Sequence, residues 1–175
     1  MARKVSSLSR AGDMARGGNR SGVGNDSKVI PARLWGKRQT GGQIEIFLLK
    51  QLADGYSYQS LIRPLKRLKL NEKIFLNGSG FYAQLTNHQQ RIVRFNKKNI
   101  NRYLNKIGHM PLPPYIKRPD EKGDRADYQT VYAKNAGSVA APTAGLHFTK
   151  KLLSKLQKEG HSFKKVTLHI NYATF

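Results

Sequence analysis

The segment from Gly137 to Thr149 holds the residues best suited to chemistry. It reads Gly-Ser-Val-Ala-Ala-Pro-Thr-Ala-Gly-Leu-His-Phe-Thr, so small residues that let a ligand approach the backbone alternate with hydroxyl groups and an imidazole. It ends where a helix is predicted to begin, and the free backbone N–H groups there can hold an anionic or polar group. His147 is a candidate general base or hydrogen-bond donor. A capped helix after a turn would give the same pattern without a ligand.

His169 is the second histidine that we single out. It lies in Val166–Ile170, where apolar and polar residues alternate as in a strand with one buried face. His169 is expected on the face opposite the core, together with Thr167 and Asn171, and an exposed strand histidine without a role fits the same pattern. The residues expected to face the core are Val166, Leu168 and Ile170.

Asn25 and Asp26 stand just before a basic and apolar segment. They could contact a polar ligand, and an Asx turn is the simpler explanation. His88 and His161 are assigned no role, and for His109, which follows the predicted end of a helix, a histidine without a role is the simpler interpretation.

Basic residues dominate the charge, with 32 Lys and Arg against 10 Asp and Glu and a formal net charge of +22. A chain of this charge attracts polyanions, nucleic acid first and an anionic membrane surface second. Two basic groups with nearby aromatic residues would suit contacts to an RNA backbone, although each alone is typical of a solvated face. The predicted RNA-binding residues are Arg63, Lys66, Arg67, Lys69, Lys97, Lys98 and Arg102, and the aromatic residues are Tyr56, Tyr58 and Phe81.

Several classes of chemistry find no support in the sequence. The absence of cysteine excludes disulfides, thiolate catalysis and cysteine-ligated zinc, and the scattered histidines predict no metal site. No apolar run is long enough to span a membrane, and the N-terminus lacks the apolar region of a secretory signal. Phosphate-loop, dinucleotide-binding and nucleophile-elbow motifs are missing. The residues alone indicate a basic α+β protein that binds RNA, and they define no reaction.

The elements that must position these residues fall into two groups. Residues 1–24, rich in Gly, Arg and Ser, predict a disordered tail because they can bury little apolar surface. Five short strands separated by Gly and Asn turns then predict a small antiparallel barrel or sandwich. These strands are Gln43–Leu49, Tyr56–Ile62, Lys73–Leu76, Phe81–Thr86 and Arg91–Phe95.

Beyond the strands the periodicity becomes helical. Ile100, Tyr103, Leu104 and Ile107 share one face of a predicted helix that ends at Gly108. Residues 128–132 predict a short helical turn, and 137–146 a loop of small residues. Thr149 is a predicted N-cap for a helix over residues 150–159.

Four blocks, in order, resemble one family. Residues 25–34 read Asn-Asp-Ser-Lys-Val-Ile-Pro-Ala-Arg-Leu, residues 111–116 read Pro-Leu-Pro-Pro-Tyr-Ile, and residues 128–133 read Tyr-Gln-Thr-Val-Tyr-Ala. Residues 139–149 read Val-Ala-Ala-Pro-Thr-Ala-Gly-Leu-His-Phe-Thr, and Thr167-Leu168-His169 follows. The sequence is similar in these blocks to the S-adenosylmethionine:tRNA ribosyltransferase-isomerases of queuosine biosynthesis. It resembles the middle portion of such an enzyme, truncated at both ends.

The resemblance implies a reaction, its partners and its site. The ribosyl part of S-adenosylmethionine moves to the aminomethyl group of a 7-deazaguanine base in tRNA and rearranges, giving epoxyqueuosine, while adenine and methionine leave. S-adenosylmethionine is then a substrate, no metal is needed, and a cytoplasmic monomer without membrane contact is expected. His147 and His169 are the implied catalytic residues. The implied substrate-binding residues are Asn25, Asp26, Arg33, Tyr128, Gln129, Pro142, Thr143, Gly145 and Thr149.

The resemblance also implies a mixed α/β architecture, in which a main α/β domain carries a small inserted antiparallel β-barrel. Residues 25–34 and 96–175 would belong to the main domain, residues 35–95 to the barrel, and residues 1–24 to the disordered tail. Two positions depart from the family pattern: Asp127 stands where an Arg is usual, and Asn171-Tyr172-Ala173 replaces Gly-x-Gly. A non-catalytic RNA-binding fragment, or an inactive remnant of the enzyme, is the alternative.

Overall fold

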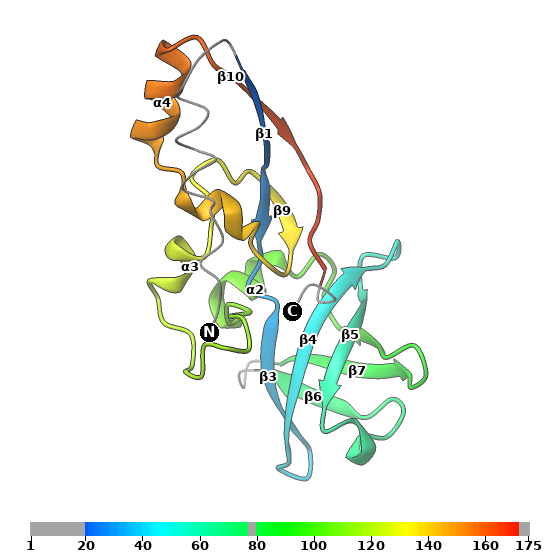
Figure 1. The fold of residues 1–175 in the computed structure, drawn as a ribbon. Helices are drawn as coiled ribbons and strands as arrows, with labels where there is room; N and C mark the ends of the chain where they lie inside the picture. Colours follow the sequence, from blue (N-terminus) through cyan, green and yellow to red (C-terminus); the bar gives the residue numbers. More distant parts are fainter. Residues whose placement is uncertain (1–19, 77–79, 172–175) are drawn as a thin grey trace.

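The computed structural model describes residues 20–76 and 80–171 (Figure 1). A closed six-stranded antiparallel barrel lies at one end, and the rest is built from two pairs of parallel strands with short helices around them (Figure 1). This arrangement confirms the predicted mixed α/β class with a small barrel. The domain boundaries themselves stay a prediction.

The barrel closes in the order β3-β4-β5-β8-β7-β6. Alternation explains its core, because every second side chain of a strand points inward, as Ile44, Ile46 and Leu48 of β4 do at 1% exposure or less. The strands are β3 (Arg33–Arg38), β4 (Gln43–Gln51), β5 (Ser57–Arg63), β6 (Lys73–Leu76), β7 (Phe81–Asn87) and β8 (Ile92–Phe95).

The prediction of five barrel strands missed β3. Its inward positions are Leu34 and Gly36, and the glycine breaks the alternation of large residues that marks a strand. Gly36 is needed because a Cβ there would lie 2.9 Å from Leu76 Cδ2 and closer still to Ile74. Tyr58 and Phe81, predicted to contact RNA, are instead 4% and 2% exposed, because both point into the barrel.

Two parallel pairs lie above the barrel in Figure 1. Strand β1 (Ser21–Asn25) pairs with β10 (Ser162–Val166), and β2 (Ser27–Val29) pairs with β9 (Asn135–Ser138). The prediction of disorder was therefore wrong for residues 21–24, and residues 1–19 lie outside the described residues. Backbone pairing orders β1 without large apolar side chains, and Gly24 lets the ring of Phe163 lie directly against the strand.

The last predicted strand was also placed wrongly. Strand β10 ends at Val166, where the pairing with β1 ends, and residues 167–171 are not a strand. Val166 is 42% exposed and Leu168 is 64% exposed, so neither faces a core. Side chains of Asn25 and Ser138, rather than a paired strand, hold the backbone of Leu168 and Ile170.

The two longer helices follow the predictions, whereas the helical turn expected near Tyr128 is not found. Helix α2 (Asn101–Ile107) buries Leu104 against the barrel and ends at Gly108, whose N–H donates to the Leu104 carbonyl. Helix α3 (Asp124–Asp127) comes before residues 128–132 rather than within them, and Val131 is 41% exposed while Tyr128 is buried. The remaining helices of residues 20–76 and 80–171 are η1 (Leu65–Arg67), η2 (Thr143–His147) and α4 (Lys150–Lys158), and β9 and η2 occupy much of the predicted small-residue loop.

Thr149 caps α4 as predicted, since its hydroxyl oxygen accepts the N–H of Leu152 at 3.1 Å. Replacing Thr149 with alanine leaves that N–H without its partner and is expected to lower the free energy of unfolding by about 1 kcal/mol. Urea unfolding measures the change, and Thr149→Ser, which keeps the hydroxyl, is the control. Equal stability of the alanine and serine variants would contradict the capping role.

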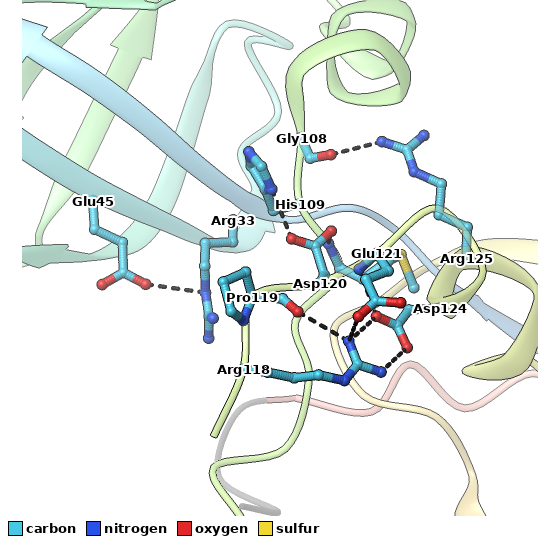
Figure 2. A network of polar contacts seen from close by, with 11 residues as sticks. Arg33, Glu45, Gly108, His109, Arg118, Pro119, Asp120, Glu121, Asp124 and Arg125 are labelled. Carbon is cyan, nitrogen blue, oxygen red and sulfur yellow. Dashed lines mark hydrogen bonds and ion pairs between the residues drawn. The ribbon is translucent and has the colours of Figure 1, made fainter. Parts of the chain in front are cut away.

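A polar network ties residues 118–125 to the barrel side of the molecule (Figure 2). Arg118 donates to both carboxylate oxygens of Asp124, at 2.7 and 2.8 Å, and Arg125 donates to the carbonyls of Asn105 and Gly108 at 2.7 Å. The carboxylate of Asp120 contacts Nδ1 of His109 and accepts the N–H of Met110, both at 2.7 Å. Asp120 and Arg125 thus fix this loop against the end of α2, and the Arg118–Asp124 pair holds the loop together.

The Arg118–Asp124 pair predicts a contribution to acid sensitivity. The guanidinium of Arg118 and the N–H of Glu121 lower the pKa of Asp124 to about 2, below its value in an unfolded chain. The pair therefore stabilises the fold above about pH 4, and this contribution is lost as the pH falls from about 4 to 2. Thermal melts of the wild type and Asp124→Asn across this range should converge as the pH falls.

Arg118→Met provides the check on this assignment. If the two side chains act as one unit, the double variant Arg118→Met with Asp124→Asn should keep no more of its thermal stability in acid than either single variant does. Fully additive effects of the two substitutions would contradict the pairing.

Candidate functional site

A cavity of about 390 Å³ lies between the barrel and the end of the parallel strands. Its barrel side comes from the end of β4 and from Tyr58 of β5, and Asn101 of α2 lies at its margin. Its other side comes from Gly137 of β9 and from residues 169–171. The volume falls within the range of small-molecule sites, and both apolar and polar groups line it.

His169, one of the two predicted catalytic residues, lines this cavity. Its imidazole lies directly over Gly137, because a Cβ on that residue would be 2.7 Å from Cε1 and 2.9 Å from Nδ1 of the ring. Gly137 has a φ of +146°, which a side chain would also disfavour. Glycine is thus required at position 137 both for the backbone conformation and to leave room for the imidazole. The side chain of His169 is itself exposed.

The backbone on both sides of His169 is fixed by side chains. The amide of Asn25 accepts the N–H of Leu168 at 3.0 Å and donates to its carbonyl at 2.8 Å. On the other side the Ser138 hydroxyl accepts the N–H of Ile170 at 2.8 Å. Asn25 also accepts the N–H of Ser27, which is the predicted Asx turn. Hydrogen bonds therefore fix the backbone on both sides of the residue that carries the imidazole.

Asp26 anchors the same segment from within the protein. It is 6% exposed, and its carboxylate accepts the Thr167 hydroxyl at 2.6 Å and the Asn135 side-chain amide at 3.2 Å. The hydrogen bond from Thr167 holds the pKa of Asp26 below its ordinary value against the opposing effect of burial. Asp26 is therefore a fixed negative charge beside the segment that carries His169.

Tyr58 is a lining residue to which the sequence reasoning gave another role, a contact to RNA. Within the described part of the chain its buried hydroxyl has no hydrogen-bond partner, and burial raises its pKa to about 12. A buried hydroxyl without a partner is uncommon, and in a residue that lines a cavity it is a candidate contact for a polar ligand atom. The signal was present in β5, where Tyr58 shares the inward face with Ser60 and Ile62.

Asn171 also lines the cavity, at a position where the family resemblance led us to expect a glycine. The substitution therefore places an amide side chain at the wall. Tyr172 and Ala173 lie outside the described residues. The other departure, Asp127, is exposed at the end of α3 and does not line the cavity.

Three predicted substrate-binding residues have structural partners outside the cavity. Gln129 holds the backbone of Val29, accepting its N–H at 3.0 Å and donating to its carbonyl at 2.7 Å. Tyr128 is 7% exposed in a small core, where burial raises its pKa. Arg33 pairs with Glu45 at 3.0 Å and lies over the ring of Phe47.

The residues predicted around η2 do not line the cavity either. His147, Thr143 and Thr149 are exposed, and Pro142 is half-buried before the helix. Gly145 is buried, and a Cβ there would overlap the Tyr132 hydroxyl and lie 2.7 Å from Thr130 Cγ2. The small residue thus allows η2 to pack closely. The structure separates His147 from the cavity that His169 lines.

The two predicted RNA-binding groups lie at opposite ends of β5. Lys98 contacts Gly55, just before the strand begins, whereas Arg63 is its last residue and η1 follows. A strand of seven residues is about 23 Å long, so the groups do not form one patch. The predicted residues outside the strand are exposed: Lys66, Arg67, Lys69, Lys97, Lys98 and Arg102.

The described residues contain neither a cluster of metal-ligating side chains nor a membrane-spanning helix. No group of three or more His, Cys, Asp or Glu side chains in residues 20–76 and 80–171 is placed to hold a metal ion. No helix in the same part of the chain is long and apolar enough to cross a membrane.

Comparisons with known proteins identify what the chain is similar to. Residues 19–175 match the model of the queuosine biosynthesis protein family. The chain is 46% identical over 153 residues to an S-adenosylmethionine:tRNA ribosyltransferase-isomerase from Sulfurihydrogenibium sp., and 44% identical over 155 residues to one from Trichlorobacter lovleyi. Each match covers 86% of this chain and 45% of the relative, so the chain spans somewhat less than half the length of these relatives.

One solved structure is also similar. The crystal structure of an S-adenosylmethionine tRNA ribosyltransferase from Thermotoga maritima matches 91% of this chain and 44% of its own length. The sequence identity is 25% and the TM-score is 0.39.

Proposed function

Because this chain belongs to the queuosine biosynthesis protein family, we propose that it takes part in the transfer and isomerisation of the ribosyl group of S-adenosylmethionine onto tRNA. The observation that carries the proposal is the identity of 44–46% to relatives named for that activity. The acceptor is the aminomethyl group of a 7-deazaguanine base already in tRNA. The products are epoxyqueuosine in tRNA, adenine and methionine.

The cavity beside His169 is the proposed place for S-adenosylmethionine. The reaction needs groups that take protons from the reacting centres and give one to the departing adenine. An imidazole can do either near neutral pH. The fixed backbone on both sides of His169 would hold that imidazole in one position, and the free hydroxyl of Tyr58 would donate a hydrogen bond to a polar atom of the substrate.

Asp26 has a supporting part in this proposal. A carboxylate held ionised by Thr167 and Asn135 is a poor proton donor, so its part is to position the segment and to supply negative charge near a sulfonium. His147 stays a second proposed catalytic residue, and its exposed place on η2 would require a substrate that extends beyond the cavity.

The proposed macromolecular partner is tRNA. A net charge of +22 favours an RNA phosphate backbone, and binding is expected to weaken by roughly 0.7–0.9 log units per tenfold rise in salt for each phosphate contacted. A monomer in the cytoplasm, without a metal ion, completes the proposal.

Release of adenine tests the function directly. The purified chain is given S-adenosylmethionine and tRNA that carries the aminomethyl-deazaguanine, and unmodified tRNA is the control. Adenine release that requires the modified base supports the proposal. A chain that melts cooperatively and binds tRNA but releases no adenine would be a non-catalytic RNA-binding fragment, and the proposal of activity would be wrong.

A further inference from the structure

A second cavity, of about 680 Å³, lies at the C-terminal end of α2, whereas the cavity lined by His169 and Tyr58 touches Asn101 at the start of that helix. Trp35 of β3 forms one wall, the end of α2 with Gly108 and His109 forms the second, and residues 120–125 form the third. None of its lining residues lines the first cavity. The proposed ribosyl transfer leaves it unused.

Trp35 is the most unusual residue of this cavity. It is 43% exposed on the outer face of the barrel, although it is the only tryptophan in the sequence and a large apolar side chain. An indole beside an open cavity offers a flat apolar surface on which a planar ring can stack. Nucleic-acid bases are such rings, and they stack on aromatic side chains without need of a particular sequence.

The charges around Trp35 favour an anion. Lys106 and Lys122 line the cavity, and neither forms an ion pair with a residue in the described part of the chain. Of the two acidic groups at the wall, Asp120 is engaged by His109 and the N–H of Met110, whereas Glu121 is exposed and lies 3.7 Å from Arg118. Two free ammonium groups beside an aromatic plane match a phosphate joined to a base.

The cavity walls are held in place before any ligand arrives. Backbone hydrogen bonds join Arg33 and His109 in both directions, at 3.2 and 2.8 Å, so the β3 wall and the His109 wall are one unit. Arg125 joins the third wall to the end of α2 through the carbonyls of Asn105 and Gly108 (Figure 2). Figure 2 shows one imidazole nitrogen of His109 turned toward Asp120 and the other turned away from it. A preformed site loses less entropy on binding.

We propose that this cavity is a nucleotide subsite, in which one unpaired base of the RNA stacks on Trp35 and its phosphate lies between Lys106 and Lys122. His109, oriented by Asp120, lies at the rim, and its other ring nitrogen accepts a hydrogen bond from the same nucleotide. The subsite binds a nucleotide of the RNA other than the one that is modified. The proposal rests on RNA as the partner in the proposed function.

Because Trp35 is the only tryptophan, its fluorescence reports on this cavity alone. The probes are guanosine 5′-monophosphate, guanosine and inorganic phosphate, with free N-acetyltryptophanamide as the correction for absorbed light. Saturable quenching by the monophosphate, at lower concentration than by guanosine and absent with phosphate, is the expected result. No saturable quenching by the monophosphate would overturn the proposal.

Variants assign the contacts. Lys106→Ala with Lys122→Ala is expected to raise the Kd of the monophosphate about tenfold, whereas Lys151→Ala with Lys155→Ala, which removes the same charge from α4, should leave it unchanged. Equal effects of the two pairs would mean attraction by net charge alone and would contradict the subsite. Both pairs are surface residues, and a thermal melt verifies that each variant is folded.

Binding of tRNA, followed by anisotropy of a label on the RNA, separates this proposal from the proposed function. Trp35→Ala should weaken it by about tenfold to a hundredfold, as the loss of one stacked base does, and Trp35→Tyr should restore most of it. Tight tRNA binding that neither quenches Trp35 nor responds to Trp35→Ala would refute the subsite and leave the function standing. Absent tRNA binding would refute the RNA partner and the subsite together.

Discussion

Replacing His169 with alanine is expected to reduce tRNA-dependent adenine release by about 10²–10⁴-fold, because the substitution removes the imidazole that we propose moves protons in the cavity. The fold should persist, since the side chain is exposed and the segment is held by backbone contacts to Asn25 and Ser138. Steady-state release with modified tRNA measures the loss, and a thermal melt of the same sample verifies folding.

Two other histidines serve as matched controls for this variant. His88→Ala removes an imidazole from the turn between β7 and β8 and should leave release unchanged. His147→Ala removes the other proposed catalytic histidine from η2. Full activity of His169→Ala, together with complete loss in His147→Ala, would place the reaction at η2 and contradict the assignment to the cavity.

Replacing Gly108 with alanine is expected to lower the free energy of unfolding by about 3 kcal/mol, because the new methyl group has no room. Its Cβ would overlap the carbonyl oxygen of Pro31 and lie 2.6 Å from the carbonyl oxygen of Leu104. Neither oxygen can move easily, since both belong to backbone at the junction of α2 with the barrel. The melting temperature should fall by about 6–12 °C for a chain of this length.

Gly123→Ala is the control for this substitution. Gly123 has the helical φ of −63°, and its nearest neighbour to a new Cβ is a flexible carboxylate oxygen of Asp127 at 3.6 Å. Alanine there should leave stability unchanged or raise it slightly, because it restricts the unfolded chain. Similar melting temperatures for the two variants would show that the close contacts at Gly108 relax without cost.

The barrel and the helices were predictable because their patterns are local. Ile44, Ile46 and Leu48 alternate along one strand, and Ile100 and Leu104 repeat along one helix, so short stretches determine which face is buried. Strand β1 could not be predicted in this way. Its order comes from backbone pairing with β10, in which Ser21 pairs with Ser162, 141 residues away in sequence, and from Gly24, which admits the ring of Phe163.

The candidate site was predictable in part. The sequence singled out His169 and Asn25, but it could not show that Asn25 clamps the backbone beside His169, because that contact joins distant segments. Tyr58 was misread as an exposed RNA contact, although its alternation with Ser60 and Ile62 indicated an inward position. The small residues around Gly145 suggested that a ligand approaches the backbone there. The structure shows instead that Gly145 allows close packing against Tyr132.

The central claim is that S-adenosylmethionine binds in the cavity beside His169, and histidine NMR tests it most directly. The five histidines give five imidazole signals, each assigned by a single substitution, and S-adenosylmethionine is titrated into the folded chain. The account predicts a saturable shift of the His169 signal, with those of His88 and His161 unmoved. Saturable binding that leaves the His169 signal in place, or that shifts His147 alone, would contradict it.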